Sequence, residues 1–281
     1  MTVAVSAPVV DFFEQCLPAL RWPEPMTLTE WAEEYAYLPP ESSAEPGKWR
    51  AYPFQKGIQD AMTDPAVEIV SLMKSARVGY TRMVDNLIGY HIAHDPCAIM
   101  MVQPTIEDAE NYSKDEFETM VRDTDCLNDL LAIGKKRDTL AFKRFPRGSI
   151  RFIVSNSPNG FRRVTIRVML FDEVDAYPCE AGSEGDPISL GTKRTETYEN
   201  RKIIAGSTPT DGQSRIAVMY RSGDRRRYYV PCPHCGHMHV LIFKNLKWPD
   251  GDPWSAYFVC PECEQHITHE KKIWMIERGG G

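Results

Sequence analysis

The sequence lacks any run of about 18 apolar residues, the length that a membrane-spanning helix requires. We therefore expect no membrane partner. The apolar stretch from Val3 to Phe13 has no basic leader and is interrupted by Pro8 and Asp11, so it is a poor signal peptide. Internal repeats and low-complexity segments are also missing, and the composition is that of a folded chain rather than a disordered one.

Positive charge is not in excess either, because the net charge at pH 7 is -6. This balance argues against a uniformly basic nucleic-acid coat, although a protein that grips DNA needs only a local basic surface.

Of eight cysteines, four form two CxxC pairs and four are scattered, which suits a reducing compartment better than a disulfide framework. A chain of 281 residues can hold one sizeable core and a small appendage.

Short apolar runs alternate with helical segments through the middle of the chain. Strands are expected at 67–73, 98–102, 150–154, 164–171 and 202–205. This alternation predicts an α/β fold with a mainly parallel sheet and flanking helices. After Arg227 the sequence changes to Cys, His and aromatic residues in short β-like pieces. We expect three parts: an N-terminal helical segment and linker (1–44), a main α/β domain (45–225), and a small C-terminal domain (226–281).

The N-terminal part contains one clear helix signal. Thr27 and Glu30 fit a capping box, and Trp31 belongs to a one-face apolar pattern. We expect a short amphipathic helix that ends at Pro39-Pro40.

Two acids follow the expected strand at 164–171. Burial of that strand would fix Asp172 and Glu173 at its carboxyl end, where open α/β sheets bind ligands. In a nucleotide-hydrolysing protein, Asp172 would hold Mg²⁺ through its water shell, and Glu173 would orient and deprotonate the attacking water. The alternative is an ordinary strand that ends in a polar turn.

A strand, a tight loop and a helix follow one another upstream of these acids, in the order that a phosphate-binding loop requires. Against the pattern GxxxxGK[ST], Gly79 and Thr81 fit, Tyr80 occupies the lysine position, and Lys74 replaces the first glycine. The loop amides can still cradle phosphates, Thr81 can ligate Mg²⁺, and Lys74 or Arg77 can supply the cation. The alternative is a basic turn without a ligand.

The C-terminal domain carries two matched knuckles, Cys232-Pro-His-Cys235 and Cys260-Pro-Glu-Cys263. Together they can offer four thiolates to one tetrahedral Zn²⁺, although their separation is a little longer than usual. A unit of ~40 residues buries too little apolar surface to fold alone, whereas structural Zn²⁺ provides ~10–16 kcal/mol in small finger peptides. We therefore predict a structural zinc ribbon. A redox dithiol pair and four unrelated cysteines are the alternatives, and four thiolates disfavour catalytic zinc because they leave no open position.

The segment Lys74-Ser-Ala-Arg-Val-Gly-Tyr-Thr-Arg82 resembles the deviant phosphate loop of lambda-type phage terminase large subunits, in which the lysine begins the loop. The resemblance extends to Tyr52-Pro-Phe-Gln55, Asp172-Glu173, Gly191-Thr-Lys-Arg194 and Gly206-Ser-Thr-Pro209. These motifs span most of residues 45 to 240. The resemblance implies a P-loop-type ATPase domain, a small C-terminal zinc ribbon, and ATP-driven translocation of double-stranded DNA into a procapsid.

The resemblance also implies roles for individual residues. Lys74 would contact the β- and γ-phosphates, and Gln55 with the aromatic Tyr52 would recognise adenine. The implied nucleotide-binding set is Tyr52, Gln55, Lys74, Ser75, Ala76, Arg77, Val78, Gly79, Tyr80 and Thr81. Gly206, Ser207 and Thr208 would couple hydrolysis to DNA movement, because in this class their strand inserts between the phosphate-loop strand and the acid-bearing strand. Without the resemblance, these three residues are a plain strand-to-loop turn.

Several arginines and lysines remain open candidates. An arginine that stabilises transition-state charge contributes ~10³–10⁵ in rate, and the candidates are Arg77, Arg162, Arg163 and Arg194. The candidates for contact with DNA phosphates are Arg221, Arg225, Arg226 and Arg227, and more weakly Lys135-Lys136-Arg137. A solvated charged surface is an equal alternative for each run.

The expected cofactors are Mg²⁺ with ATP and structural Zn²⁺. By resemblance, the partners are double-stranded DNA, a small terminase subunit, and the portal and procapsid, with a homo-oligomer as the active state. The small subunit would engage the helix around Trp31, unless that helix packs on its own core. The expected location is the host bacterial cytoplasm rather than the mature virion.

Full-length terminases of this type also carry a metal-dependent nuclease domain downstream of the ribbon. Because this chain ends at Gly281, we expect it to hydrolyse ATP without cutting DNA. Two other functions remain open: a helicase-like nucleic-acid-dependent ATPase, and a non-enzymatic zinc-bearing DNA-binding fragment whose phosphate loop is inactive.

Overall fold

The computed structural model describes residues 25–41, 43, 46–132 and 138–281. The apolar stretch from Val3 to Phe13 and the basic run Lys135-Lys136-Arg137 lie outside the described residues. Within the described part, no helix combines the length and the apolar character that crossing a membrane requires.

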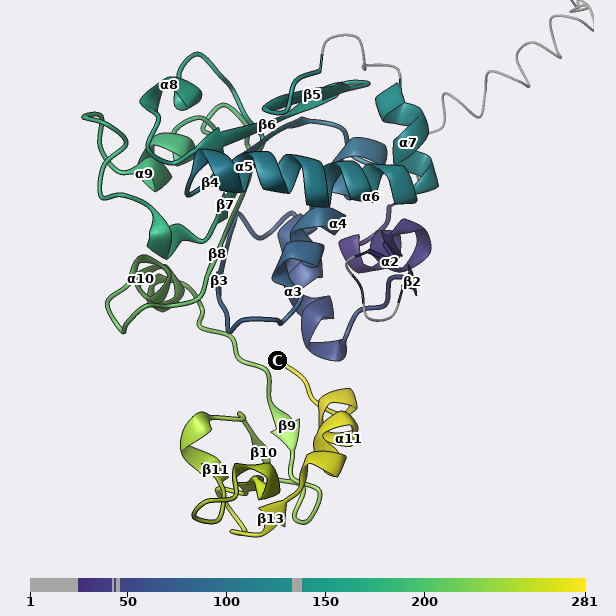
Figure 1. Cartoon of the computed structure of the whole chain (residues 1–281), viewed down its shortest axis with the longest axis vertical. Helices are drawn as coiled ribbons and strands as arrows, with labels where there is room; N and C mark the ends of the chain where they lie inside the picture. Colours follow the sequence, from purple (N-terminus) through teal and green to yellow (C-terminus); the bar gives the residue numbers. More distant parts are fainter. Residues whose placement is uncertain (1–24, 42, 44–45, 133–137) are drawn as a thin grey trace, which may run out of the picture.

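A six-stranded sheet forms the centre of the molecule, in the order β3-β8-β7-β4-β6-β5 (Figure 1). Its strands are β3 (Ile69–Met73), β8 (Lys202–Ser207), β7 (Val168–Asp172), β4 (Ala98–Gln103), β6 (Gly148–Val154) and β5 (Phe142–Phe145). All neighbouring pairs are parallel except β5 with β6. The prediction of an α/β fold with a mainly parallel sheet is confirmed, and the antiparallel edge strand β5 was not predicted.

Helices cover both faces of this sheet, which is why its central strands are nearly continuous apolar runs. The described helices before residue 226 are α2 (Leu28–Tyr35), α3 (Pro53–Thr63), α4 (Tyr80–Ala93), α5 (Ile106–Asn111), the π-helix η1 (Tyr112–Phe117), α6 (Glu118–Asp123), α7 (Asp125–Ala132), α8 (Pro158–Phe161), the 3-10 helix η3 (Val174–Ala176), α9 (Pro187–Thr192) and α10 (Arg215–Ser222).

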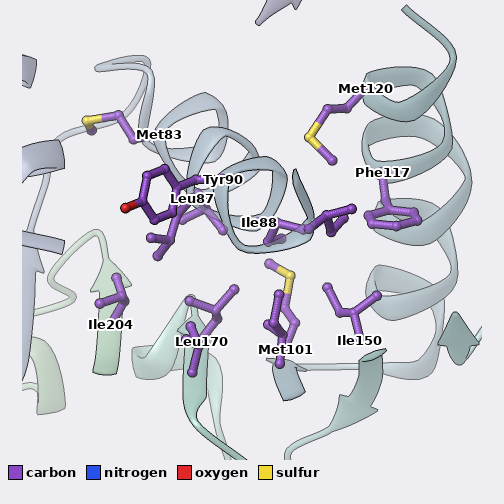
Figure 2. Packing of buried hydrophobic residues seen from close by; sticks show 14 of the residues in the cluster. Met83, Leu87, Ile88, Tyr90, Met101, Phe117, Met120, Ile150, Leu170 and Ile204 are labelled. Atoms are coloured by element: carbon purple, nitrogen blue, oxygen red, sulfur yellow. The ribbon is translucent and has the colours of Figure 1, made fainter. Parts of the chain in front are cut away.

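Alternate residues of the central strands β4, β7 and β8 enter two separate cores, as the period of two requires. Met101 of β4 points to the face covered by α4, where Leu87 and Ile88 meet Leu170 and Ile204 of the neighbouring strands (Figure 2). The adjacent residues Met100, Met169 and Ile203 belong to the second core, together with residues of α8 and α10. The sheet is therefore buried on both sides and holds the ends of its strands in fixed positions.

The predicted N-terminal helix forms with its capping box intact. The Thr27 hydroxyl accepts the Glu30 amide at 3.2 Å, and the Glu30 carboxylate accepts the Thr27 amide at 2.8 Å. The helix ends at Tyr35, before the expected Pro39-Pro40, because the next residues form strand β1 (Tyr37–Leu38), which pairs with β2 (Gly47–Lys48). Trp31 is 2% exposed and packs against Tyr90, so this helix closes the core of its own chain.

The last part of the chain, residues 226–281, is called here the four-cysteine unit. Its elements are β9 (Val230–Pro231), β10 (Met238–His239), η4 (Phe243–Asn245), β11 (Leu246–Lys247), η5 (Pro253–Ser255), β12 (Tyr257–Val259), β13 (His266–Ile267), η6 (His269–Lys271) and α11 (Lys272–Glu277). All its strand pairs are antiparallel. Figure 1 shows it as a separate lobe, joined to the sheet by the segment that follows α10.

Candidate nucleotide site and four-cysteine cluster

The loop between β3 and α4, named here the phosphate loop, contains two residues with positive φ. Gly79 is the N-cap of α4 with a φ of 82°, and a Cβ atom there would lie 2.4 Å from the Gln55 amide nitrogen. Arg77 also adopts a positive φ of 62°. The left-handed backbone and the close approach of Gln55 Nε2 both favour glycine at position 79.

Gln55 braces this loop against the start of α3. Its Oε1 accepts the Tyr52 amide and its Nε2 donates to the Val78 carbonyl, both at 2.9 Å. The Gln55 side chain is 4% exposed. Both ends of its side-chain amide bind backbone groups, so Gln55 supports the phosphate loop, and its implied role in adenine recognition stays a prediction.

Lys74 and the acid pair meet at the carboxyl ends of β3 and β7. The Lys74 amine lies 2.6 Å from Glu173 Oε1, and its side chain is 9% exposed. Glu173 adopts a φ of 47°, which turns the chain at the end of β7. Asp172 accepts a hydrogen bond from Gln103 Nε2 at 3.1 Å, and burial raises the pKa of its carboxyl group to about 6. Lys74 and Glu173, far apart in the sequence, are therefore direct neighbours.

Strand β8 lies between β3 and β7, as the resemblance implied. Its last residue, Ser207, donates from Oγ to Glu173 Oε2 at 3.2 Å, and the Thr208 amide lies 3.4 Å from the same oxygen. The Lys74 amide donates to the Ser207 carbonyl at 3.1 Å. The ends of three adjacent strands are thus joined through one carboxylate.

Tyr80, at the usual lysine position of the loop motif, turns its ring into the protein. The ring is 4% exposed, and its hydroxyl donates to the Phe171 carbonyl at 3.5 Å. A Cβ atom on Gly206 would lie 2.2 Å from this ring, so the tyrosine packs directly on the backbone of β8. The Lys74 amine lies 5.2 Å from the ring centroid, a cation–π contact. Only the backbone of Tyr80 is available to a phosphate group.

Two residues of the site were missed by the sequence analysis. Gln103 holds Asp172, and Asp175 accepts the amides of Thr210 and Ile216 at 3.1 and 2.9 Å. Asp175 thereby ties the turn after the acid pair to the start of α10. Gln103 could have been predicted from the sequence, because it is the polar last residue of an apolar strand. The carboxyl ends of adjacent parallel strands lie at the same edge of a sheet. No sequence pattern pointed to Asp175.

The candidate arginines are not brought together. Arg77 lies in the loop and is exposed, whereas Arg162 pairs with Glu184. Of the basic run before β9, Arg221 donates to the Gly212 carbonyl, Arg226 pairs with Asp224, and Arg227 donates to the Tyr220 hydroxyl at 3.3 Å. Three of the four predicted DNA-contact arginines are therefore engaged in local contacts.

The four cysteines of the two knuckles converge on one point. Their sulfur atoms all lie within 4.8 Å of one another, and the pairs Cys232–Cys263 and Cys235–Cys260 are 3.8 Å apart. A tetrahedral Zn²⁺ with Zn–S bonds of about 2.3 Å requires sulfur separations of roughly 3.8 Å. The arrangement therefore has the dimensions of a four-thiolate zinc site.

Comparisons with known proteins show which family the chain is similar to. The chain is 34% identical over 284 residues to the terminase large subunit of Enterobacteria phage P21, covering 94% of this chain and 44% of that protein. It is 36% identical over 264 residues to the terminase large subunit of Escherichia phage lambda, covering 89% of this chain and 41% of that protein. The chain thus spans less than half the length of these relatives.

Among solved structures, the chain is similar to the HK97 bacteriophage large terminase, with a TM-score of 0.55 and 17% identity over 70% of this chain and 41% of that one. This likeness concerns the fold alone. The family model described as "Phage terminase large subunit gpA, ATPase domain" matches residues 43–280. The chain belongs to the family of phage terminase large subunit gpA ATPase domains.

Proposed function

We propose that this chain hydrolyses ATP in the presence of Mg²⁺ and that hydrolysis drives double-stranded DNA into a phage procapsid. The observation that carries the proposal is the meeting of Lys74, Glu173 and Ser207 at the carboxyl ends of three adjacent strands. An amine, a carboxylate and a hydroxyl beside a glycine-containing loop at a helix N-terminus are the groups that phosphoryl transfer uses.

Each of these residues has a role that its position permits. The amides of residues 75–81 and the N-terminus of α4 would bind the phosphates, with Lys74 supplying positive charge. Thr81 and Asp172 would hold Mg²⁺, and bound Mg²⁺ would neutralise charge on the β- and γ-phosphate oxygens. Asp172 is mostly ionised at neutral pH because its pKa lies near 6. Glu173 would orient the attacking water and take its proton.

The coupling residues contact the oxygen of Glu173 that Lys74 does not. Ser207 and the Thr208 amide face Oε2, and Asp175 fixes the following turn to α10. A change at the Glu173 carboxylate would therefore alter the hydrogen bonds of Ser207 and Thr208. We propose that this is the route by which hydrolysis reaches α10 and the chain beyond it.

The proposed zinc ligands, division of the chain, partners and location rest on the membership of the terminase family. We propose structural Zn²⁺ at Cys232, Cys235, Cys260 and Cys263, and a division of the chain into parts 1–44, 45–225 and 226–281. The proposed partners are double-stranded DNA, a small terminase subunit, the portal and procapsid, and further copies of this chain. The proposed setting is the host bacterial cytoplasm.

The test is steady-state ATP hydrolysis by the purified chain with Mg²⁺, with and without double-stranded DNA. The wild-type chain should turn over ATP, and DNA should increase the rate. Lys74→Ala should abolish turnover, whereas Lys244→Ala, at an exposed position of the four-cysteine unit, should not. Turnover equal in Lys74→Ala and wild type would remove the phosphate loop from the reaction. Strand separation of a duplex by the wild type would favour the helicase-like alternative.

A further inference from the structure

Three aromatic side chains form a continuous set of ring contacts from the four-cysteine unit to the edge of the phosphate loop. Tyr52 stacks on Phe54 with ring centroids 5.7 Å apart and an interplanar angle of 4°. Phe54 meets Tyr228 edge-on at 6.1 Å and 71°. Tyr52 is 63% exposed, whereas Phe54 and Tyr228 are half-buried. The outermost ring therefore keeps most of its surface open while the two inner rings support it.

The backbone of the residue that carries the open ring is linked to the phosphate loop through one side chain. Tyr52 is the N-cap of α3, and Gln55 accepts its amide while donating to the Val78 carbonyl of the loop. One side chain thus spans the whole distance between the Tyr52 backbone and the loop backbone. A nucleotide bound with its phosphates in the loop and its base toward the start of α3 would meet this ring.

The inner end of the set is fixed by the four-cysteine unit. The Tyr228 hydroxyl donates to the Ile276 carbonyl at the end of α11, at 2.6 Å. A Cβ atom on Gly279 would lie 2.4 Å from the Tyr228 ring, so the chain passes directly against it. Tyr228 also packs against the core that contains Cys232 and Cys260. Its position depends on the folded state of that unit, and α11 itself contacts α3.

We propose that Phe54 and Tyr228 are positioning residues that hold the Tyr52 ring for stacking on the base of the bound nucleotide. The four-cysteine unit thereby contributes to base recognition at the ATP site, an inference that rests on the proposed ATPase function. The physical reason is preorganisation: a ring already held in its binding orientation loses less freedom when the base stacks on it. The phosphates are bound by other residues and do not depend on this contact.

The experiment compares two ligands, ATP and inorganic tripolyphosphate, each with Mg²⁺, by isothermal titration calorimetry on the full chain. Tripolyphosphate has the phosphates and no base. Tyr228→Ala and Phe54→Leu should each raise the Kd for ATP roughly 2- to 12-fold, the range expected for one aromatic contact, and leave the Kd for tripolyphosphate unchanged. Tyr229→Ala is the matched control, because its side chain is 44% exposed and only its backbone pairs with Gly280.

The outcomes separate this inference from the proposed function. Equal weakening of both ligands, or no change for ATP, overturns the positioning role. A wild-type chain that binds ATP no more tightly than tripolyphosphate also overturns it. A wild-type chain that binds neither ligand refutes the ATP site itself. If circular dichroism and zinc content show that Tyr228→Ala does not fold, the two Kd values of Phe54→Leu, on the other side of the same ring contact, test the positioning role.

Discussion

The six-stranded sheet and the four-cysteine unit are stabilised by different means. Both faces of the sheet are covered by large buried clusters, whereas the core of the four-cysteine unit consists of Val230, Cys232, Cys260, Ile267 and Met275. Apolar burial contributes roughly 25 cal/mol per Å², so the first region has ample stabilisation and the second has little. A single substitution in the sheet should therefore lower stability by a limited amount, whereas the fold of the four-cysteine unit should depend on the proposed zinc ion.

Removal of the metal gives the largest expected effect. Cys232→Ser, or a strong zinc chelator, should unfold the four-cysteine unit, because structural zinc contributes about 10–16 kcal/mol in small finger units. Hydrogen exchange followed by mass spectrometry should show lost protection in residues 228–280 and unchanged protection in β4, β7 and β8. Cys179→Ser, at an exposed free cysteine, is the control. Simultaneous loss of protection in the sheet would show that the two regions are one cooperative unit.

The next effect concerns chemistry at the sheet edge. Glu173→Gln should lower the rate of ATP hydrolysis by ~10²–10⁴, the usual contribution of a general base, and should leave the Kd for ATP nearly unchanged. Glutamine keeps an oxygen that can accept from Ser207 and Thr208 but cannot take a proton from water. Glu199→Gln, at an exposed position, serves as the control. Turnover at the wild-type rate would contradict the role given to Glu173.

A buried acid inside the sheet region should make stability depend on pH. Asp85 is 2% exposed and accepts from Tyr112 at 2.5 Å and from Arg82 at 3.1 Å, and burial raises its pKa to about 7. The native state then keeps a proton that the unfolded chain releases near pH 4. Stability should therefore fall as pH rises from about 4 to about 7, by at most about 4 kcal/mol.

Asp85→Asn cannot ionise and should reduce this decline. Thermal unfolding of the wild type and the variant, measured at several pH values between 5 and 8, gives the difference between them. Subtraction removes the contribution of other acids such as Asp172. Parallel curves for the two proteins would show that Asp85 is ionised in the native state throughout this range.

The smallest effect tests how closely β8 and α4 pack. Gly206→Ala should destabilise the chain by roughly 1–3 kcal/mol, the usual cost of overpacking, because the new methyl group would lie 2.2 Å from the buried Tyr80 ring. Gly212→Ala is the matched control, since no heavy atom of the described residues beyond its chain neighbours lies within 4 Å of its Cβ position. Chemical denaturation measures both. An equal, small change in the two variants would mean that Tyr80 moves aside without cost.

How much the sequence predicts differs between these regions for physical reasons. The central strands β4, β7 and β8 are buried on both faces, so their apolar runs identified them. Edge strand β5 is short and carries Lys143 and Arg144, and it was missed. The first strand begins at Ile69 rather than at residue 67, and the acid-bearing strand at Val168 rather than at 164, because strand ends depend on neighbours that the sequence does not show.

At the candidate site, motif order predicted the strands and loops on which the candidate residues lie. It did not predict their contacts. The Lys74–Glu173 pair and the brace by Gln55 are long-range interactions set by strand order and by the packing of α3. The buried ring of Tyr80 was also not predictable, because a tyrosine after a loop glycine is compatible with either a surface or a core position.

The proposed ATP hydrolysis requires that Lys74, Asp172 and Glu173 surround one nucleotide. A crystal structure of the chain with Mg²⁺ and a non-hydrolysable ATP analogue tests this most directly. The account predicts the triphosphate on the amides of residues 75–81, the Lys74 amine within hydrogen-bonding distance of a phosphate oxygen, and the metal between Thr81 and Asp172. A nucleotide bound elsewhere on the sheet, with Lys74 still paired to Glu173, would contradict it.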